Sequence, residues 1–176
     1  MRLNNKLVAT AKNERVDYVL GSKVTGCTVA DGKVVSVTVG TAGAGKEIKA
    51  DAVVLAGGGF ESGALKLDSH GHLHETILDL PVTMPEGVKE EDLIHGDYWG
   101  SPQPLFLCGV EVDETMLVTY QGKPVHSNVY AAGGVIAGAT RWQEKSGEGI
   151  ALGSAIKAAD AILSSVGAGA ATKERN

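Results

Sequence analysis

The stretch VYAAGGVIAGATRWQEKSGEGIALGSAIKAADAI, residues 129–162, decides the fold of this chain. Its spacing predicts a strand over residues 128–132, then paired glycines, a polar loop and a helix over residues 148–164. Ser146 suits the helix N-cap, Glu148 lies in the first turn, and Gly147 and Gly149 leave the first N–H groups uncovered. Such a helix end is a site for an anion or a carbonyl oxygen. The alternative is a helix of small residues that only packs tightly.

A second strand end lies in ADAVVLAGGGFESG, residues 50–63. Residues Ala52 to Leu55 are apolar without alternation, which predicts a strand covered on both faces, as in a parallel sheet between helices. The three glycines that follow allow positive φ angles and a close approach of the backbone. They fit either a ligand site or a tight turn in a core.

Upstream of this strand, the sequence predicts a short amphipathic helix over residues 2–14 and an antiparallel hairpin. The hairpin strands are Val24–Ala30 and Lys33–Val39, and Asp31-Gly32 between them is a strong turn signal. A turn over 40–45 leads to another short strand. Residues 40–47 match GxxxxGK, but Glu47 stands where a phosphate-binding loop needs Ser or Thr, so we interpret them as a hairpin turn.

The middle segment, residues 60–127, is irregular and holds all five prolines and all five histidines. It predicts a cap or substrate lobe inserted into a sheet domain made of residues 1–59 and 128–166, with a flexible tail over 167–176. We expect no membrane span, because no apolar run approaches about 20 residues.

Histidines 70, 72 and 74 alternate in HGHLHE, with Asp68 and Glu75 close by. On a strand the three rings would share one face, as metal ligands can. Proton transfer fits them better than a metal, and a solvated loop fits better still, so we predict no metal site. Arg141 offers a planar fork for a carboxylate or a phosphate, or is an ordinary surface side chain.

Composition excludes several classes of function. The net charge is −5 and aromatic residues are few, which disfavours binding of nucleic acid. Cys27 and Cys108 lie far apart, which fits a reducing compartment rather than a disulfide or zinc site. The N-terminal residues lack the apolar core of a signal peptide.

The order of these segments resembles the C-terminal half of the FAD-dependent flavoproteins related to fumarate reductase and succinate dehydrogenase. It is similar, more closely, to the family formed by the B subunit of anaerobic glycerol-3-phosphate dehydrogenases. The motifs that carry this resemblance span almost the whole chain: RLNNKL, VVLAGGGFESGAL, HETILDLPV, NVYAAGGVIAG and GEGIALGSA.

The resemblance implies an α/β fold, a partial Rossmann-like FAD/NAD(P)-binding domain with an antiparallel meander and an inserted cap. It implies oxidation of sn-glycerol 3-phosphate to dihydroxyacetone phosphate, with electrons passed to a quinone, and FMN or FAD as cofactor. The implied partners are the catalytic flavoprotein and the membrane-associated iron–sulfur protein of the same dehydrogenase. The implied location is the cytoplasm or the inner face of the membrane. The implied cofactor-binding residues are Ala56, Gly57, Gly58, Ala132, Gly133, Gly147, Glu148, Gly149 and Ile150.

The chain departs from these flavoproteins in two ways. It has no strand–GxGxxG–helix unit, so we expect a truncated piece that binds flavin weakly and is inactive alone. Gly134 stands where many relatives carry an acidic residue, and His74 and Arg141 are our candidates for the catalytic positions. The alternative function is a non-catalytic module that pairs with a partner protein, or with itself, through exposed edges.

Overall fold

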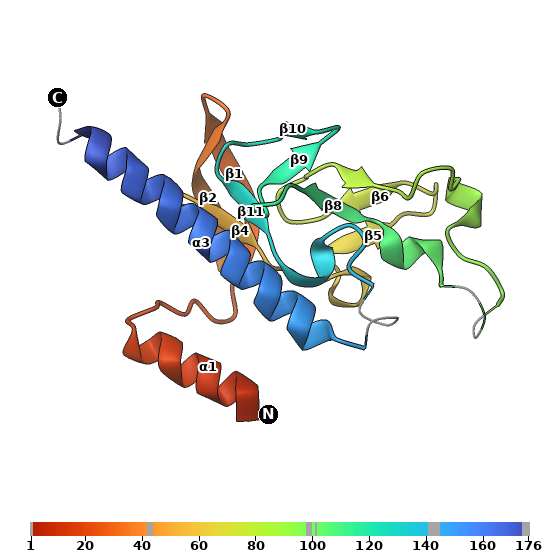
Figure 1. Ribbon diagram of the computed structural model, residues 1–176, viewed down its shortest axis with the longest axis horizontal. Helices are drawn as coiled ribbons and strands as arrows, with labels where there is room; N and C mark the ends of the chain where they lie inside the picture. Colours follow the sequence, from red (N-terminus) through yellow and green to blue (C-terminus); the bar gives the residue numbers. More distant parts are fainter. Residues whose placement is uncertain (1, 42–43, 98–99, 101, 141–144, 174–176) are drawn as a thin grey trace.

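The computed structural model describes residues 2–41, 44–97, 100, 102–140 and 145–173. Within these residues the strands form four small sheets, and a long C-terminal helix crosses the parallel one (Figure 1). The structure is therefore mixed α/β, as the sequence predicts, and it contains an antiparallel meander.

The meander consists of β1 (Lys23–Ala30), β2 (Lys33–Thr41) and β3 (Ala44–Lys49), in that order. Asp31 and Gly32 have φ angles of 49° and 71°, which is the geometry that a two-residue hairpin with right-handed twist requires. The predicted hairpin is confirmed. Strands β2 and β3 pair antiparallel up to Thr41 and Ala44, so the described residues of the GxxxxGK match are strand where the sequence analysis expects a turn over 40–45, and residues 42–43 lie outside the described part of the chain.

The parallel sheet pairs β4 (Val53–Leu55) with β11 (Val129–Ala131), although about seventy residues separate them in the sequence. The two predicted strands and the parallel sheet expected for residues 52–55 are confirmed, and the structure adds that these two strands pair with each other. The prediction that β4 is covered on both faces is wrong, because the side chain of Val54 is 42% exposed. Leu55 points to the covered side and is buried.

The buried Asn128 connects the parallel sheet to the meander. Its Oδ1 accepts the Val34 N–H at 2.9 Å, and its Nδ2 donates to the carbonyl oxygens of Val34 and Asp51 at 2.7 and 2.9 Å. These bonds use both N–H donors of the amide and one of the two lone pairs on its oxygen. Asn128 therefore fixes the start of β11 beside β2 and β4.

Residues 60–127 form two further sheets. One pairs β5 (Leu65–Leu67) with β6 (Leu73–Glu75), and the other has the order β10 (Lys123–Pro124), β9 (Val118–Tyr120), β8 (Gly109–Val112), β7 (Val82–Thr83). Four 3-10 helices, η1 to η4, cover Phe60–Ser62, Glu90–Asp92, Pro104–Leu107 and Gly133–Val135. Single bridges join Val110 to Ile136 and Leu117 to Tyr130. This region therefore pairs with β11 and with the segment that follows η4.

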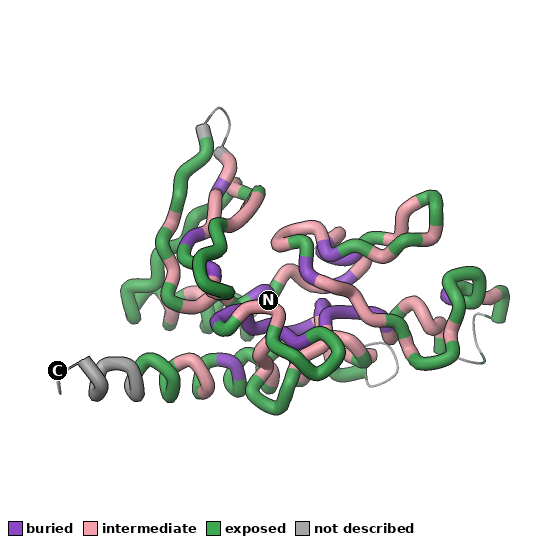
Figure 2. Tube along the Cα trace, turned by 90° about the horizontal axis from the view of Figure 1, so that it is seen from above, coloured by how far each residue is buried: buried purple, intermediate pink, exposed green. Residues whose placement is uncertain are grey.

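The core lies where the meander, the parallel pair and β8–β9 meet (Figure 2). Its members are buried aliphatic side chains from these parts and from β5, η4 and the segment before β7: Val34, Leu55, Leu65, Leu80, Val110, Val118, Val129, Ala131 and Val135. Burial of these side chains removes apolar surface from water and supplies the main favourable term in folding.

Helix α1 (Arg2–Asn13) confirms the predicted N-terminal helix, and Figure 1 shows it set apart from the sheets. Leu3 and Leu7 on its apolar face are 48% and 47% exposed. The residues after it also expose large apolar side chains, up to Leu20 at 85%. The amphipathic pattern correctly predicts the helix, but its apolar face packs on none of the sheets in the described structure.

Helix α3 (Gly147–Lys173) begins where predicted but continues through residues 167–173, where the sequence analysis expects a flexible tail. Residues 147–166 are also long and apolar enough to cross a membrane, by length and composition alone, contrary to our expectation. The sequence shows no continuous apolar run because the large apolar side chains, such as Ile150, Leu152 and Ile156, are separated by Gly, Ala and polar residues. The described contacts of α3 are with β11 and η4.

Candidate functional site

An open cleft of about 450 Å³ lies where the ends of β4 and β11 face the first two turns of α3. Three segments that are distant in the sequence contribute to its lining: Ala56 with Gly58, residues 132–134 and the start of α3. The lining residues are Ala56, Gly58, Ala132, Gly133, Gly134, Gly147, Glu148, Ala151 and Ala155. The carboxyl ends of parallel strands facing a helix N-terminus form the usual ligand position of open α/β sheets.

Two lining glycines have a left-handed backbone conformation; Gly133 keeps the cleft open, whereas a Cβ on Gly58 would meet the Ser62 side chain. Gly58 and Gly133 have φ angles of 80° and 77°, which side-chain-bearing residues rarely adopt. A Cβ built on Gly133 would lie 3.8 Å from the Cβ of Ala151 across the cleft, so a side chain there would fill the space between the two walls. Small residues on both walls therefore create the volume.

The structure brings six of the nine predicted cofactor-binding residues to the cleft: Ala56, Gly58, Ala132, Gly133, Gly147 and Glu148. Gly57, Gly149 and Ile150 do not line it. A Cβ on Gly57 would lie 2.6 Å from Cδ1 of Ile77, and a Cβ on Gly149 would lie 2.3 Å from the Ser146 hydroxyl. These two glycines therefore make room for neighbouring side chains of the protein itself. Gly134, which sequence analysis singled out only as a departure, does line the cleft.

Gly134 also lines a second, smaller cavity of about 90 Å³. The other lining residues are Gly59, Phe60, Glu61, Phe106, Cys108 and Ala139. The Cys108 side chain is 2% exposed, and burial raises the pKa of its thiol from 9.0 to about 11. Its S–H donates to the Pro104 carbonyl oxygen at 3.6 Å. Cys108 is therefore a packed, protonated thiol rather than a nucleophile.

We expect Cys108 to resist alkylation in the folded chain. A pKa of about 11 in place of 9.0 lowers the thiolate fraction about a hundredfold at pH 8, and burial lowers access further. Mass spectrometry after timed exposure to iodoacetamide should find Cys27, which is partly exposed, labelled first. In urea the two thiols should react at similar rates. Labelling of Cys108 as fast as Cys27 under native conditions would contradict this environment.

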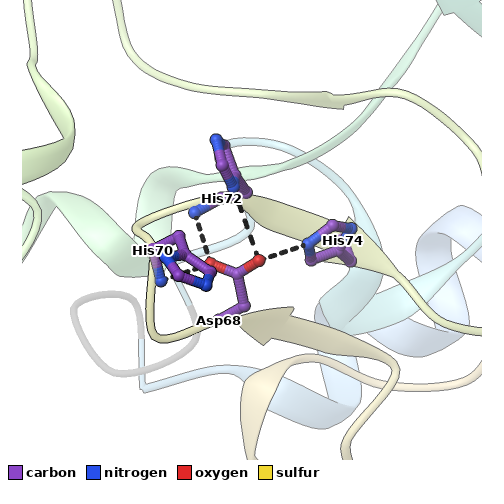
Figure 3. A network of polar contacts seen from close by, with 4 residues as sticks. All are labelled: Asp68, His70, His72 and His74. Atoms are coloured by element: carbon purple, nitrogen blue, oxygen red, sulfur yellow. Dashed lines mark hydrogen bonds and ion pairs between the residues drawn. The ribbon is translucent and has the colours of Figure 1, made fainter.

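The alternating histidines surround Asp68 rather than the cleft (Figure 3). Asp68 Oδ1 accepts the N–H groups of His70 and His72 at 2.8 and 2.9 Å, and Oδ2 lies 3.1 Å from His74 Nε2. The His72 N–H, and then the His74 ring, hold the pKa of Asp68 well below its usual range. The cluster ties the turn between β5 and β6 together.

Neither candidate catalytic residue is placed in the cleft. His74 bonds to Asp68 and is absent from the cleft lining, and Arg141 lies outside the described residues. Among the residues that the structure describes, no group of His, Cys, Asp or Glu is arranged to hold a metal ion.

A sequence model of the family described as "FAD binding domain" matches residues 1–150. The chain belongs to this FAD-binding family. Its curated relatives include the B subunit of anaerobic glycerol-3-phosphate dehydrogenase from Haemophilus influenzae (strain PittEE), 31% identical over 122 residues. The same-named proteins of Glaesserella parasuis and Yersinia pestis are 30% and 32% identical over 118 residues. The resemblance stated from the sequence motifs is thus confirmed.

These alignments cover 66–67% of this chain but only 26–27% of each relative. The chain therefore spans about a quarter of the length of the curated relatives it matches. No solved structure matches it. The family supports FAD as the cofactor and gives no support to FMN.

Proposed function

We propose that this chain supplies one part of the flavin site of an FAD-dependent oxidoreductase. The observation that carries the proposal is the 450 Å³ cleft, in which two parallel strand ends and a helix start meet in a member of an FAD-binding family. Its size is within the range of cofactor and drug-sized sites. Its glycine and alanine lining fits a flat, rigid ring system that needs close backbone approach.

The charges of the cleft suggest which part of FAD it holds. Glu148 is the one charged residue in the described lining, and its carboxylate would repel a phosphate but accept hydrogen bonds from hydroxyl or ring N–H groups. The N–H groups at the start of α3 suit a ring carbonyl, on which negative charge collects when a flavin is reduced. We infer that the ring and ribityl part binds here and that the phosphates are held elsewhere.

When bound, FAD would supply two-electron acceptance from an alcohol carbon. From the names of the relatives, we propose that the substrate is sn-glycerol 3-phosphate, oxidised to dihydroxyacetone phosphate, with electrons passed to a quinone. In this proposal, residues 60–127 belong to the substrate-side lobe. The partners would be the catalytic flavoprotein and the membrane-associated iron–sulfur protein of the same dehydrogenase. The site of action would be the cytoplasm or the inner face of the membrane.

Filling the cleft should weaken flavin binding. We expect Ala151→Leu to raise the dissociation constant for FAD at least about tenfold, or 1.4 kcal/mol, because the larger side chain occupies the ring position. Ala159→Leu is the matched control, since Ala159 is exposed on the same helix and outside the cleft lining. The measurement is a titration of each purified variant with FAD and with FMN, followed by visible absorbance and fluorescence.

Equal affinities of the two variants would contradict the placement of the ring in this cleft. A failure of the unaltered chain to bind either flavin would favour the second candidate, a module without a cofactor that pairs with a partner protein. The exposed apolar side chains of Val16, Tyr18, Val19 and Leu20 favour this candidate, because contiguous exposed apolar residues mark interaction surfaces.

A further inference from the structure

Helix α3 presents two adjacent stripes, and Ser154 lies on the one that faces the protein. The packing stripe holds residues of the helix that are buried or half-buried: Gly147, which also lines the cleft, Ile150, Ser154, Ala158 and Ala161. The cleft stripe, one position away, holds Glu148, Ala151 and Ala155. One wall of the cleft is α3 and the other is the strand end after β11, residues 132–134. A contact that holds the packing stripe against this strand end therefore also sets the distance between the two walls.

The Ser154 hydroxyl makes that connection. Its Oγ accepts the Gly133 N–H at 2.9 Å and donates its proton to the Ile150 carbonyl oxygen at 2.6 Å. Within the described residues, this is the side-chain hydrogen bond that joins α3 to the strand end. The donation to Ile150 orients the hydroxyl proton along the helix, so a lone pair faces Gly133.

The neighbouring backbone groups of the strand end are satisfied without the helix. The Ala132 N–H donates to the Leu55 carbonyl oxygen at 2.9 Å, and the Gly133 carbonyl oxygen accepts the Ile136 N–H at 3.3 Å. Among the described residues, the Gly133 N–H has no backbone acceptor. Gly133 is itself buried, so its N–H needs a protein partner, and Ser154 is that partner.

We propose that Ser154 is a positioning residue that fixes the width of the cofactor cleft by holding Gly133 against α3. The part of this inference that concerns flavin affinity rests on the proposed function. The hydrogen bond also keeps the Gly133 N–H away from the ligand. A ligand at this strand end would then be recognised by the space that Gly133 leaves, because it has no side chain, and not by a hydrogen bond from the Gly133 N–H.

Three variants test this role. Ser154→Ala removes the hydroxyl, Ser154→Thr retains it, and Ser164→Ala is the matched control. Ser164 donates to the Asp160 carbonyl oxygen at 2.8 Å in the same way, and the described residues give its hydroxyl no partner outside the helix. The first readout is amide hydrogen exchange at Gly133, resolved by NMR. The second is the FAD dissociation constant together with the visible spectrum of the bound flavin.

We expect Ser154→Ala to accelerate exchange at Gly133 about tenfold or more, because the opened amide loses its partner. We expect the FAD dissociation constant to rise about tenfold and the spectrum of the bound flavin to shift, since a cleft wall that is no longer held loosens the site. Ser154→Thr should restore both readouts, and Ser164→Ala should leave both unchanged.

Unchanged exchange at Gly133 in Ser154→Ala would overturn the proposal, as would FAD affinity and spectrum equal to those of the Ser164→Ala control. If the unaltered chain binds no flavin, the proposed function fails for this chain. Exchange at Gly133 then still decides whether Ser154 fixes the cleft wall.

Discussion

Replacing Asn128 by alanine should lower the free energy of unfolding by about 2–5 kcal/mol, a large fraction of the roughly 5–15 kcal/mol of an ordinary domain. The Asn128 amide is the partner of both backbone groups of Val34, whose side chain is fully buried. Alanine leaves that N–H and that C=O without partners, and each buried orphan costs about 1–3 kcal/mol. The measurement is the urea unfolding midpoint, followed by far-UV circular dichroism.

Asn128→Asp should be at least as damaging as alanine. It keeps the acceptor for the Val34 N–H, but it replaces the Nδ2 donor with an oxygen that faces two carbonyl oxygens at 2.7 and 2.9 Å. Asn4→Ala, on an exposed face of α1, is the control and should be neutral, because alanine is the better helix former. A urea midpoint of Asn128→Ala close to that of Asn4→Ala would refute a stabilising role for the hydrogen bonds of the Asn128 side chain.

Local sequence patterns could predict the elements whose signals are local. Asp31-Gly32 predicted the hairpin, and its two positive φ angles are the physical reason. The apolar runs at 52–55 and 128–132 correctly predicted two strands, although not that they pair with each other. By contrast, the strands of two to four residues between 65 and 124 are too short to show periodicity, so the sequence analysis could only describe that region as irregular.

Long-range contacts explain what the sequence could not predict at the site. Nothing local marks Asn128 or Ser154, because the partners of their side chains lie 94 and 21 residues away. Glycine patterns did predict most of the cleft lining. Gly57 and Gly149 are absent from this lining, and their missing Cβ atoms make room for Ile77 and Ser146. A glycine in a sequence shows that space is needed but does not show which group needs it.

Replacing Gly109 by alanine should destabilise the chain by about 3 kcal/mol, at the upper end of the usual cost of overpacking. A Cβ on Gly109 would lie 2.5 Å from the Ala137 nitrogen and 2.6 Å from both the Ile136 carbonyl carbon and the Val135 carbonyl oxygen. These are backbone atoms, which cannot move away by rotating a side chain. Strand β8 and the segment after η4 would have to separate, and the bridge between Val110 and Ile136 would be strained.

The same displacement should reach the cofactor cleft, because η4 includes Gly133 and Gly134, which line it. For a chain of this length, about 3 kcal/mol lowers the melting temperature by about 6–12 °C. Gly96→Ala is the matched control, since a Cβ there meets no atom within 4 Å in the described structure, and its φ is not positive. Differential scanning calorimetry and FAD titration of both variants provide the test. If the two variants have the same melting temperature, β8 is not closely packed against the segment after η4. The cleft wall is then positioned by α3 alone.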